Sequence, residues 1–149
     1  MKVHVLQIPP DGKHYEGEIP GEVLGLNDES TRSVGPVRYA LDVGLSDGGL
    51  WAHGSVTAEV ECECVRCLER FRQVLSVPDF ACQVDLEGRD AVDLTEYLRE
   101  DTLLALPAHP HCDWDGKRVC KANFATDQSA VEPLDDREDV WKALDKLKL

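Results

Sequence analysis

The chain has 149 residues, and its 16 Lys and Arg against 29 Asp and Glu give a formal net charge of −13. This length suits one domain with a real hydrophobic core, and so acidic a surface disfavours nucleic-acid binding by the molecule as a whole. No run approaches the roughly 20 apolar residues of a membrane-spanning helix, and residues 1–10 lack the basic and apolar regions of a secretion signal. We therefore expect a cytoplasmic protein with reduced thiols.

The N-terminal part of the chain has the weakest pattern. Residues 3–8 alternate only slightly, as in a short opening strand, and residues 9–35 are rich in Gly, Pro and acidic residues. Such a composition favours loops over regular elements. We therefore predict an irregular N-terminal segment over residues 1–35, with room for a short strand.

Residues 37–62 have the clearest pattern. Apolar and polar side chains alternate over 37–46 and again over 50–62, on either side of the turn Asp47-Gly48-Gly49. Alternation with a period of two around a Gly-rich turn predicts a β-hairpin with one face toward a core.

A further strand is predicted over residues 71–86. Its interior Pro78 cannot donate to a sheet ladder, so that point belongs at a sheet edge or a bulge. Simple alternation puts one set of apolar side chains on a common face: Val74, Phe80, Cys82, Val84 and Leu86.

Two helices are predicted. Asp93 suits a helix N-cap, with Glu96 three residues later as in a capping box, and Pro107 ends this helix. Residues 125–134 form a polar linker, and residues 135–149 form a final helix with acidic residues first and lysines later, as the helix dipole favours. Residues 36–124 then make a β-rich core that includes the first helix, within a single domain spanning 1–149.

The six cysteines are at positions 62, 64, 67, 82, 112 and 120. Cys64 and Cys67 form a C-x-x-C motif, and two cysteines at this spacing bind one zinc ion from a single tight turn. Cys112 and Cys120 would complete the four tetrahedral ligands. The segment that carries them has no periodicity and few apolar residues, so a bound ion would pin it in place. Four cysteines close the coordination shell, which indicates a structural site.

Three other interpretations stay open at this point. The four cysteines are also compatible with unrelated buried thiols, or with a redox pair formed by Cys64 and Cys67. His109 or His111 could replace one cysteine as a ligand. Cys62 and Cys82 fall on apolar strand faces, where packing in the core is the simplest role.

Cations gather beside the two cysteine pairs. Two roles are open for them: a basic patch that contacts RNA or a protein partner, or local neutralisation of the acidic residues Glu63, Glu69, Asp113 and Asp115. The six cations, out of 16 in the chain, are Arg66, Arg70, Arg72, Lys117, Arg118 and Lys121.

Catalytic motifs are absent from the sequence. It contains no G-x-S-x-G elbow, no G-x-x-x-x-G-K-[ST] loop and no H-E-x-x-H pair. We therefore expect a protein that is not an enzyme. Together, the predicted elements give an α+β fold: a mainly antiparallel β-sheet or partly open barrel with two helices and a four-cysteine zinc knuckle.

The order of motifs also resembles a known family. Over about residues 36–149 the chain is similar to the YceD family of bacteria and plastids, described as large ribosomal RNA subunit accumulation proteins. The segments that carry the resemblance are Cys64-Val65-Arg66-Cys67-Leu68-Glu69, Val92-Asp93-Leu94, Leu98-Arg99-Glu100, Leu103-Leu104-Ala105-Leu106-Pro107, Pro110-His111-Cys112, Cys120 and the closing stretch from Asp135-Asp136-Arg137 through Trp141 and Leu144 to Lys146-Leu147-Lys148.

The resemblance implies a non-catalytic role in large-subunit rRNA accumulation and ribosome assembly. It points to the same four cysteines that spacing selects. The expected partner is a ribosomal protein or a pre-ribosomal particle, with or without direct rRNA contact. The alternative function is that of a thiol redox or metal-handling protein using the Cys64/Cys67 pair.

Overall fold

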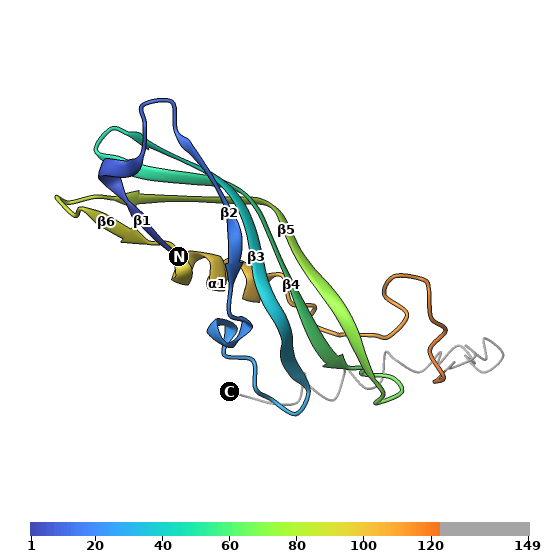
Figure 1. The fold of residues 1–149 in the computed structure, drawn as a ribbon. Helices are drawn as coiled ribbons and strands as arrows, with labels where there is room; N and C mark the ends of the chain where they lie inside the picture. The colour runs from blue at the N-terminus through green and yellow to red at the C-terminus, as the bar shows by residue number, and fades with distance from the viewer. Residues whose placement is uncertain (123–149) are drawn as a thin grey trace, which may run out of the picture.

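The computed structural model describes residues 1–122 and is dominated by a four-stranded antiparallel sheet in the order β2-β3-β4-β5 (Figure 1). A separate two-stranded sheet pairs β1 with β6, and α1 follows β6 directly. The elements are β1 (Lys2–His4), the 3-10 turn η1 (Val5–Gln7), β2 (Lys13–Ile19), the 3-10 turn η2 (Gly21–Leu24), β3 (Thr31–Ser46), β4 (Gly49–Glu63), β5 (Arg70–Asp85), β6 (Ala91–Asp93) and α1 (Thr95–Leu104). The prediction of a mainly antiparallel sheet is confirmed.

The predicted hairpin is formed by β3 and β4. Ser46 pairs with Gly49 across a two-residue turn, and pairing continues to Thr31 and Cys62 at the far end. Both turn residues have positive φ, 50° at Asp47 and 78° at Gly48. A two-residue hairpin loop requires this backbone conformation, and the Asp-Gly pair supplies it with little strain.

A bulge divides β5 into two halves with opposite alternation. Gly54 pairs with Phe80 and Val56 pairs with Val77, so β5 has one more residue than β4 over this interval. The bulge lies at Pro78, on a strand at the sheet edge, as predicted. Because the extra residue reverses the alternation, Val74 is exposed on the face opposite Phe80, and the prediction that they share a face is wrong.

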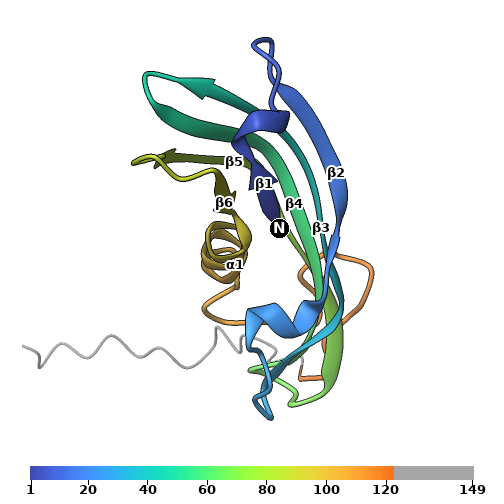
Figure 2. The ribbon, with the colours of Figure 1, turned by 60° about the vertical axis from the view of Figure 1, so that its left-hand side comes forward.

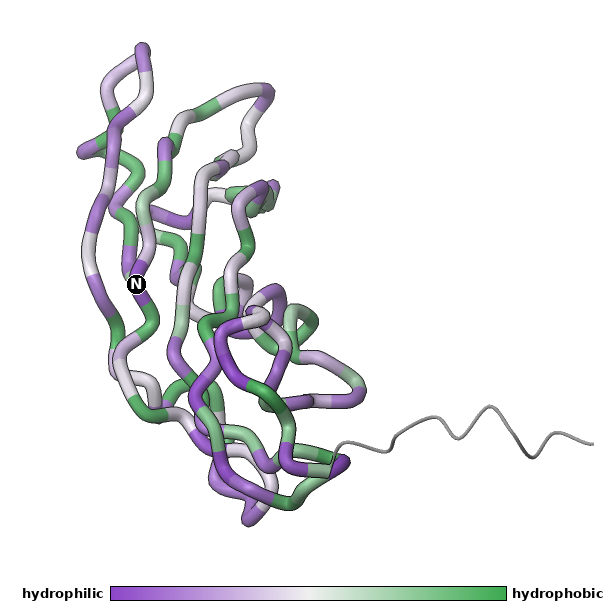
Figure 3. Tube along the Cα trace, turned by 90° about the vertical axis from the view of Figure 1, so that its right-hand side faces the viewer, coloured by the Kyte–Doolittle hydropathy of each residue, from purple (hydrophilic) through white to green (hydrophobic). Residues whose placement is uncertain are grey.

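The long strands curve, and α1, β1 and β6 lie on the concave side of the sheet (Figure 2). The main core lies between these layers, while a second group of buried residues lies at the other end of the same face. The hydropathy of the strands alternates along their length, as Figure 3 shows. The largest side chains of the main core are Leu24, Leu41, Leu50, Phe80, Leu94 and Leu98, and the second group contains Val60, Cys62, Phe71, Leu75 and three of the cysteines considered below.

The N-terminal segment contains more regular structure than predicted, because residues 13–19 form β2 along β3. The apolar signal of β2 is weak: only Tyr15 and Ile19 are apolar on its inner face, with Gly17 between them. At Gly17 an added Cβ would lie 2.7 Å from the Tyr39 hydroxyl oxygen, so a side chain here would require the Tyr39 ring to move. Backbone pairing with β3 holds β2 in the sheet.

One α-helix is present among residues 1–122, and it ends before Pro107 as expected. The linker predicted over 125–134 and the helix predicted over 135–149 lie outside the described residues. The two sheets are separate, so the partly open barrel is not confirmed. None of the helices in the described part of the chain is long and apolar enough to cross a membrane.

Candidate metal centre

The C-x-x-C motif is the turn that joins β4 to β5. Cys64 follows the last residue of β4, its N–H donates to the Glu69 carbonyl at 2.9 Å, and its carbonyl accepts from the Leu68 N–H at 2.9 Å. Leu68 has a φ of 58°, in the left-handed region. These contacts form a compact turn over residues 64–69, called here the knuckle, at one end of the long strands.

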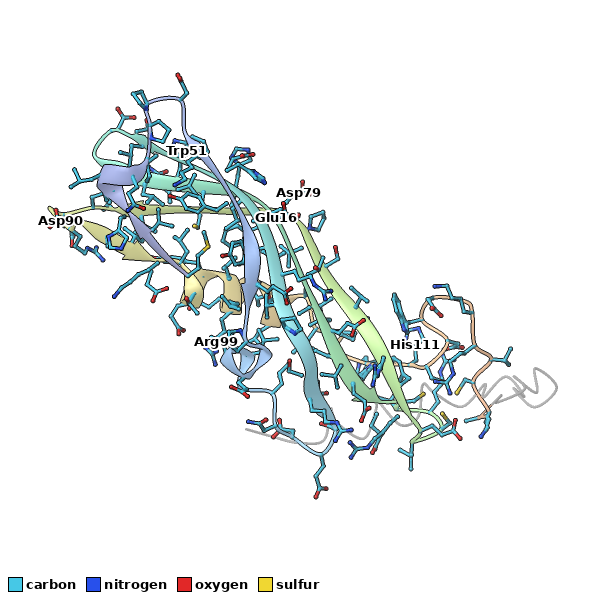
Figure 4. All side chains as sticks on the ribbon, in the orientation of Figure 1. Glu16, Trp51, Asp79, Asp90, Arg99 and His111 are labelled. Carbon is cyan, nitrogen blue, oxygen red and sulfur yellow. The ribbon has the colours of Figure 1, made fainter. Side chains whose placement is uncertain are left out.

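The second cysteine pair reaches the knuckle on residues 105–122, which follow α1 and are called here the return loop (Figure 1). The Val65 N–H donates to the Pro110 carbonyl at 2.9 Å, so backbone pairing joins the two segments. The Cys112 N–H donates to the Cys64 sulfur at 3.4 Å. In Figure 4, His111 marks this end of the molecule, and Trp51 lies near the opposite end of the sheet.

The four predicted cysteines come together in one cluster, and their sulfurs all lie within 4.8 Å of one another. The Sγ atoms of Cys64 and Cys120 are 3.9 Å apart, and those of Cys67 and Cys112 are 3.7 Å apart. All four are free thiols; Cys67 is half-buried and the other three are buried. Four convergent thiols at this separation could hold a single metal ion.

The backbone around Cys64 favours its ionised form. Burial raises the pKa of the Cys64 thiol, but N–H groups of Cys67, Arg66 and Cys112 that donate to the sulfur outweigh it and lower the pKa to about 6. At Cys112 the balance is reversed: burial, followed by hydrogen bonds with the other cysteines, raises the pKa to about 12. The folded turn therefore favours a thiolate at Cys64, whereas a thiolate at Cys112 would need a compensating cation.

Five of the six cations predicted to lie beside the cysteines form ion pairs with carboxylates. The pairs Arg66–Asp113, Arg118–Glu69 and Lys121–Glu69 connect the knuckle with the return loop. Among residues 1–122, Arg72 alone of the six has no ion pair. The distances are 3.3 Å for Arg66–Asp113, 3.3 Å for Arg70–Glu61, 3.5 Å for Lys117–Asp115 and 3.7 Å for Arg118–Glu69. Local neutralisation therefore accounts for most of this cluster.

The remaining candidate ligands lie apart from the sulfur cluster. His109 and His111 do not belong to the group of convergent ligand atoms, and the His111 ring is within 3.2 Å of the His109 carbonyl. Cys62 packs in the second group of buried residues, and burial raises its pKa. Cys82 packs against the main core, where burial and then Asp101 raise its pKa to about 11.

Two features of the centre lack a sequence signal that could have predicted them. The Val65–Pro110 hydrogen bond is a backbone contact, which any residue except a proline donor can make. A groove of about 510 Å³ also opens beside the knuckle, between the ends of β3 and β4 and the start of the return loop. Val65, Leu68, Leu106, Pro107, Ala108 and Pro110 supply its apolar lining.

Comparison with known proteins provides no relative for this chain. No protein-family model matches it, and neither the curated proteins nor the solved structures give a significant match. The assignment of a function therefore rests on the residues and their geometry.

Proposed function

We propose that Cys64, Cys67, Cys112 and Cys120 hold one structural zinc ion. The observation that supports this is the sulfur separation of 3.7 Å and 3.9 Å in two cross-segment pairs. Four sulfurs placed tetrahedrally about 2.3 Å from one zinc lie about 3.8 Å apart. These two sulfur pairs match that separation, and the remaining sulfur pairs lie within 4.8 Å. Four cysteine ligands would leave no open position for a substrate.

Zinc would supply the positive charge that lets buried thiolates lie together. The knuckle orients Cys64 and Cys67 at the end of the sheet, and the return loop contributes Cys112 and Cys120. Few apolar residues of the return loop are buried, so the metal would provide much of the free energy that orders it.

We further propose that the protein is a non-catalytic factor in large-subunit rRNA accumulation and ribosome assembly, acting through a basic ribosomal protein. The motif order resembling the YceD family supports this role. The net charge of −13 favours a cationic partner. Five of the six cations near the centre already form ion pairs with carboxylates, so they are less available to the phosphates of RNA. This favours a protein over bare RNA as the partner. The acidic factor would shield the ribosomal protein from premature RNA contacts.

Metal analysis tests the zinc site. We expect about one zinc per chain in the purified protein. Cys112→Ser should lose the metal, because it removes a buried ligand, while the matched variant Cys82→Ser should keep it. A metal-free protein that cycles a Cys64–Cys67 disulfide at cytosolic potentials would contradict the zinc proposal and favour the redox alternative.

Cellular depletion tests the assembly role. Loss of the protein should lower large-subunit rRNA relative to small-subunit rRNA, and the wild-type chain should restore it. In a parallel pull-down, a ribosomal protein should be enriched over the level seen with an unrelated protein of equal charge. Unchanged rRNA levels, or no such enrichment, would argue against the role.

A further inference from the structure

Leu68 occupies an unfavourable position for a leucine in two independent ways. Its φ of 58° places a bulky side chain in the left-handed region, where glycine is preferred. Its side chain is also 68% exposed to solvent, so it contributes little to the core. The left-handed backbone lowers the stability of the knuckle relative to a glycine at this position, and the exposed side chain offsets little of this loss through burial. Strain of this kind persists where a side chain is needed for function.

Leu68 lies at the groove described above, called here the knuckle groove. The neighbouring knuckle residue Val65 is 54% exposed and lines the same groove. The Val65 N–H donates to the Pro110 carbonyl, and this hydrogen bond joins the knuckle side of the groove to the return-loop side. The four clustered cysteines connect the same two segments. The groove is therefore a preformed apolar surface, and its volume of about 510 Å³ is enough for several side chains.

The rim of the knuckle groove is acidic. Glu63 lines it, and Asp28 and Glu29 immediately precede the lining residue Ser30 in the chain. None of these three carboxylates forms an ion pair with another residue in the described range 1–122. The nearby cations are already engaged: Arg32 and Arg70 pair with the Glu61 carboxylate, and Arg66 pairs with the Asp113 carboxylate. A ligand that complements this surface combines an apolar side chain with flanking positive charge.

We propose that the knuckle groove binds a polypeptide segment of a basic partner protein. An apolar side chain of that segment packs on Leu68 and Val65, and flanking Lys or Arg side chains face Glu63 and the 28–29 carboxylates. This proposal deepens the proposed function, on which it rests for the identity of the partner as a ribosomal protein. RNA carries phosphates that the acidic rim repels, so it does not suit this site.

Site-directed crosslinking in cells identifies the occupant. The photoreactive residue p-benzoylphenylalanine replaces Val65 in the full-length chain. A control chain carries it at Leu6, which is 91% exposed and belongs to η1, outside the knuckle and the return loop. We expect position 65, and not position 6, to capture a protein through a segment rich in Lys and Arg. Capture of RNA, of residues 135–149 of the same chain, or of nothing at position 65 would overturn the proposal.

Leu68→Gly separates binding from folding. Glycine relieves the left-handed strain, so the thermal midpoint and the zinc content should equal or exceed those of the wild type. A synthetic peptide copying the captured segment should bind this variant roughly tenfold or more weakly, the scale of one lost buried leucine contact. Leu6→Ser is the matched control and should bind normally. Equal peptide binding by Leu68→Gly, or a clear loss of stability, would overturn the role of Leu68.

The two proposals fail in distinguishable ways. If position 65 captures a basic protein that is not ribosomal, the groove proposal stands and the assembly role fails. If cellular large-subunit rRNA depends on the protein while position 65 captures no protein, the assembly role stands and the groove proposal fails.

Discussion

At the scale of single residues, the cluster of four cysteines was largely predictable because cysteine chemistry is local. The C-x-x-C spacing places two sulfurs in one turn in most backbone settings, so Cys64 and Cys67 could be paired from sequence. Selecting Cys112 and Cys120 depended on their lying in an aperiodic segment, whereas Cys62 and Cys82 fall on strand faces. The backbone N–H groups that lower the pKa of Cys64 follow from the folded turn and have no residue signature.

Cys82 should be nearly inert at neutral pH. Burial and then Asp101 raise its pKa to about 11, so at pH 8 roughly one thiol in a thousand is the reactive thiolate. We expect its alkylation by iodoacetamide to rise about tenfold per pH unit from pH 8 to 10, as followed by peptide mass spectrometry. A small thiol peptide is the control, and its rate should level off above its own lower pKa. A Cys82 rate that levels off near pH 9 would contradict this assignment.

Asp93 stabilises the start of α1 through its charge. The Thr95 hydroxyl donates to its carboxylate at 2.6 Å and the Thr95 N–H at 3.0 Å. The Thr95 hydroxyl is the largest cause of the lowered pKa of Asp93, and burial acts in opposition. With the Thr95 N–H and the N-terminal ammonium of Met1, 3.1 Å from the carboxylate, the hydroxyl lowers this pKa to about 2. The folded pKa is thus below the unfolded value, so the stabilisation is present above about pH 4 and is lost as pH falls toward 2.

Asp93→Asn should therefore lower the free energy of unfolding at pH 7 by about 1 kcal/mol, a value reduced for solvent screening at a half-exposed side chain. Urea titrations of both proteins at several pH values measure this difference. We expect the gap to narrow between pH 4 and pH 2, because the wild-type carboxylate becomes protonated. A gap that stays constant over this range would show that charge is not the cause.

At the scale of elements, alternation predicted the strands well and their faces less well. The β3–β4 hairpin has both a regular pattern and an Asp-Gly turn, so its prediction over residues 37–46 and 50–62 was confirmed. β3 also extends back to Thr31, past a register shift between Ser33 and Val37, and the pattern did not indicate this extension. In β5 the one-residue bulge at Pro78 reverses which side chains face the core. Simple alternation therefore puts Val74 on the core face, whereas it is exposed in the structure. In β2 the strand depends on backbone pairing with β3, which side-chain patterns do not encode.

At the scale of elements, Gly54 in β4 is a position that is sensitive to substitution. It lies beside the β4–β5 bulge with a φ of 152°, and an added Cβ would lie 2.1 Å from the Ala40 carbonyl oxygen. Because backbone must move to relieve this clash, Gly54→Ala should destabilise the protein by about 3 kcal/mol or more. Chemical denaturation measures the loss.

Gly48→Ala is the matched control for Gly54. Gly48 also has positive φ, 78°, but an added Cβ would meet nothing within 4 Å. Its substitution should cost only about 1 kcal/mol, the conformational penalty alone. Equal losses at the two glycines would contradict the importance of the close approach to Ala40.

At the scale of the whole molecule, the sheet is stabilised at two places by different means. The main core packs β1, β6 and α1 against the concave face, and it contains the largest buried aliphatic side chains. The second group, around Phe71 and Leu75, is smaller and is continuous with the cysteines. The position of the return loop over this group was not predictable from periodicity, because it depends on long-range sulfur and backbone contacts.

Removal of the metal should therefore loosen one end of the molecule first. After zinc chelation we expect amide hydrogen exchange to accelerate at residues 60–75 and 105–122, while protection around Leu50 and Leu98 in the main core persists. The measurement is exchange mass spectrometry with and without the chelator, and readdition of zinc should reverse the change. Uniform loss of protection across the chain would indicate a single cooperative unit instead.

The contact between the knuckle and the return loop has a further consequence for the denatured chain. A metal shared by Cys67 and Cys112 joins residues 45 positions apart (112 − 67), and thereby closes a long loop in any conformation that retains the metal. Such a cross-link makes the unfolded ensemble more compact. In urea above the unfolding transition, the unfolded chain should therefore have a smaller hydrodynamic radius with zinc than without it.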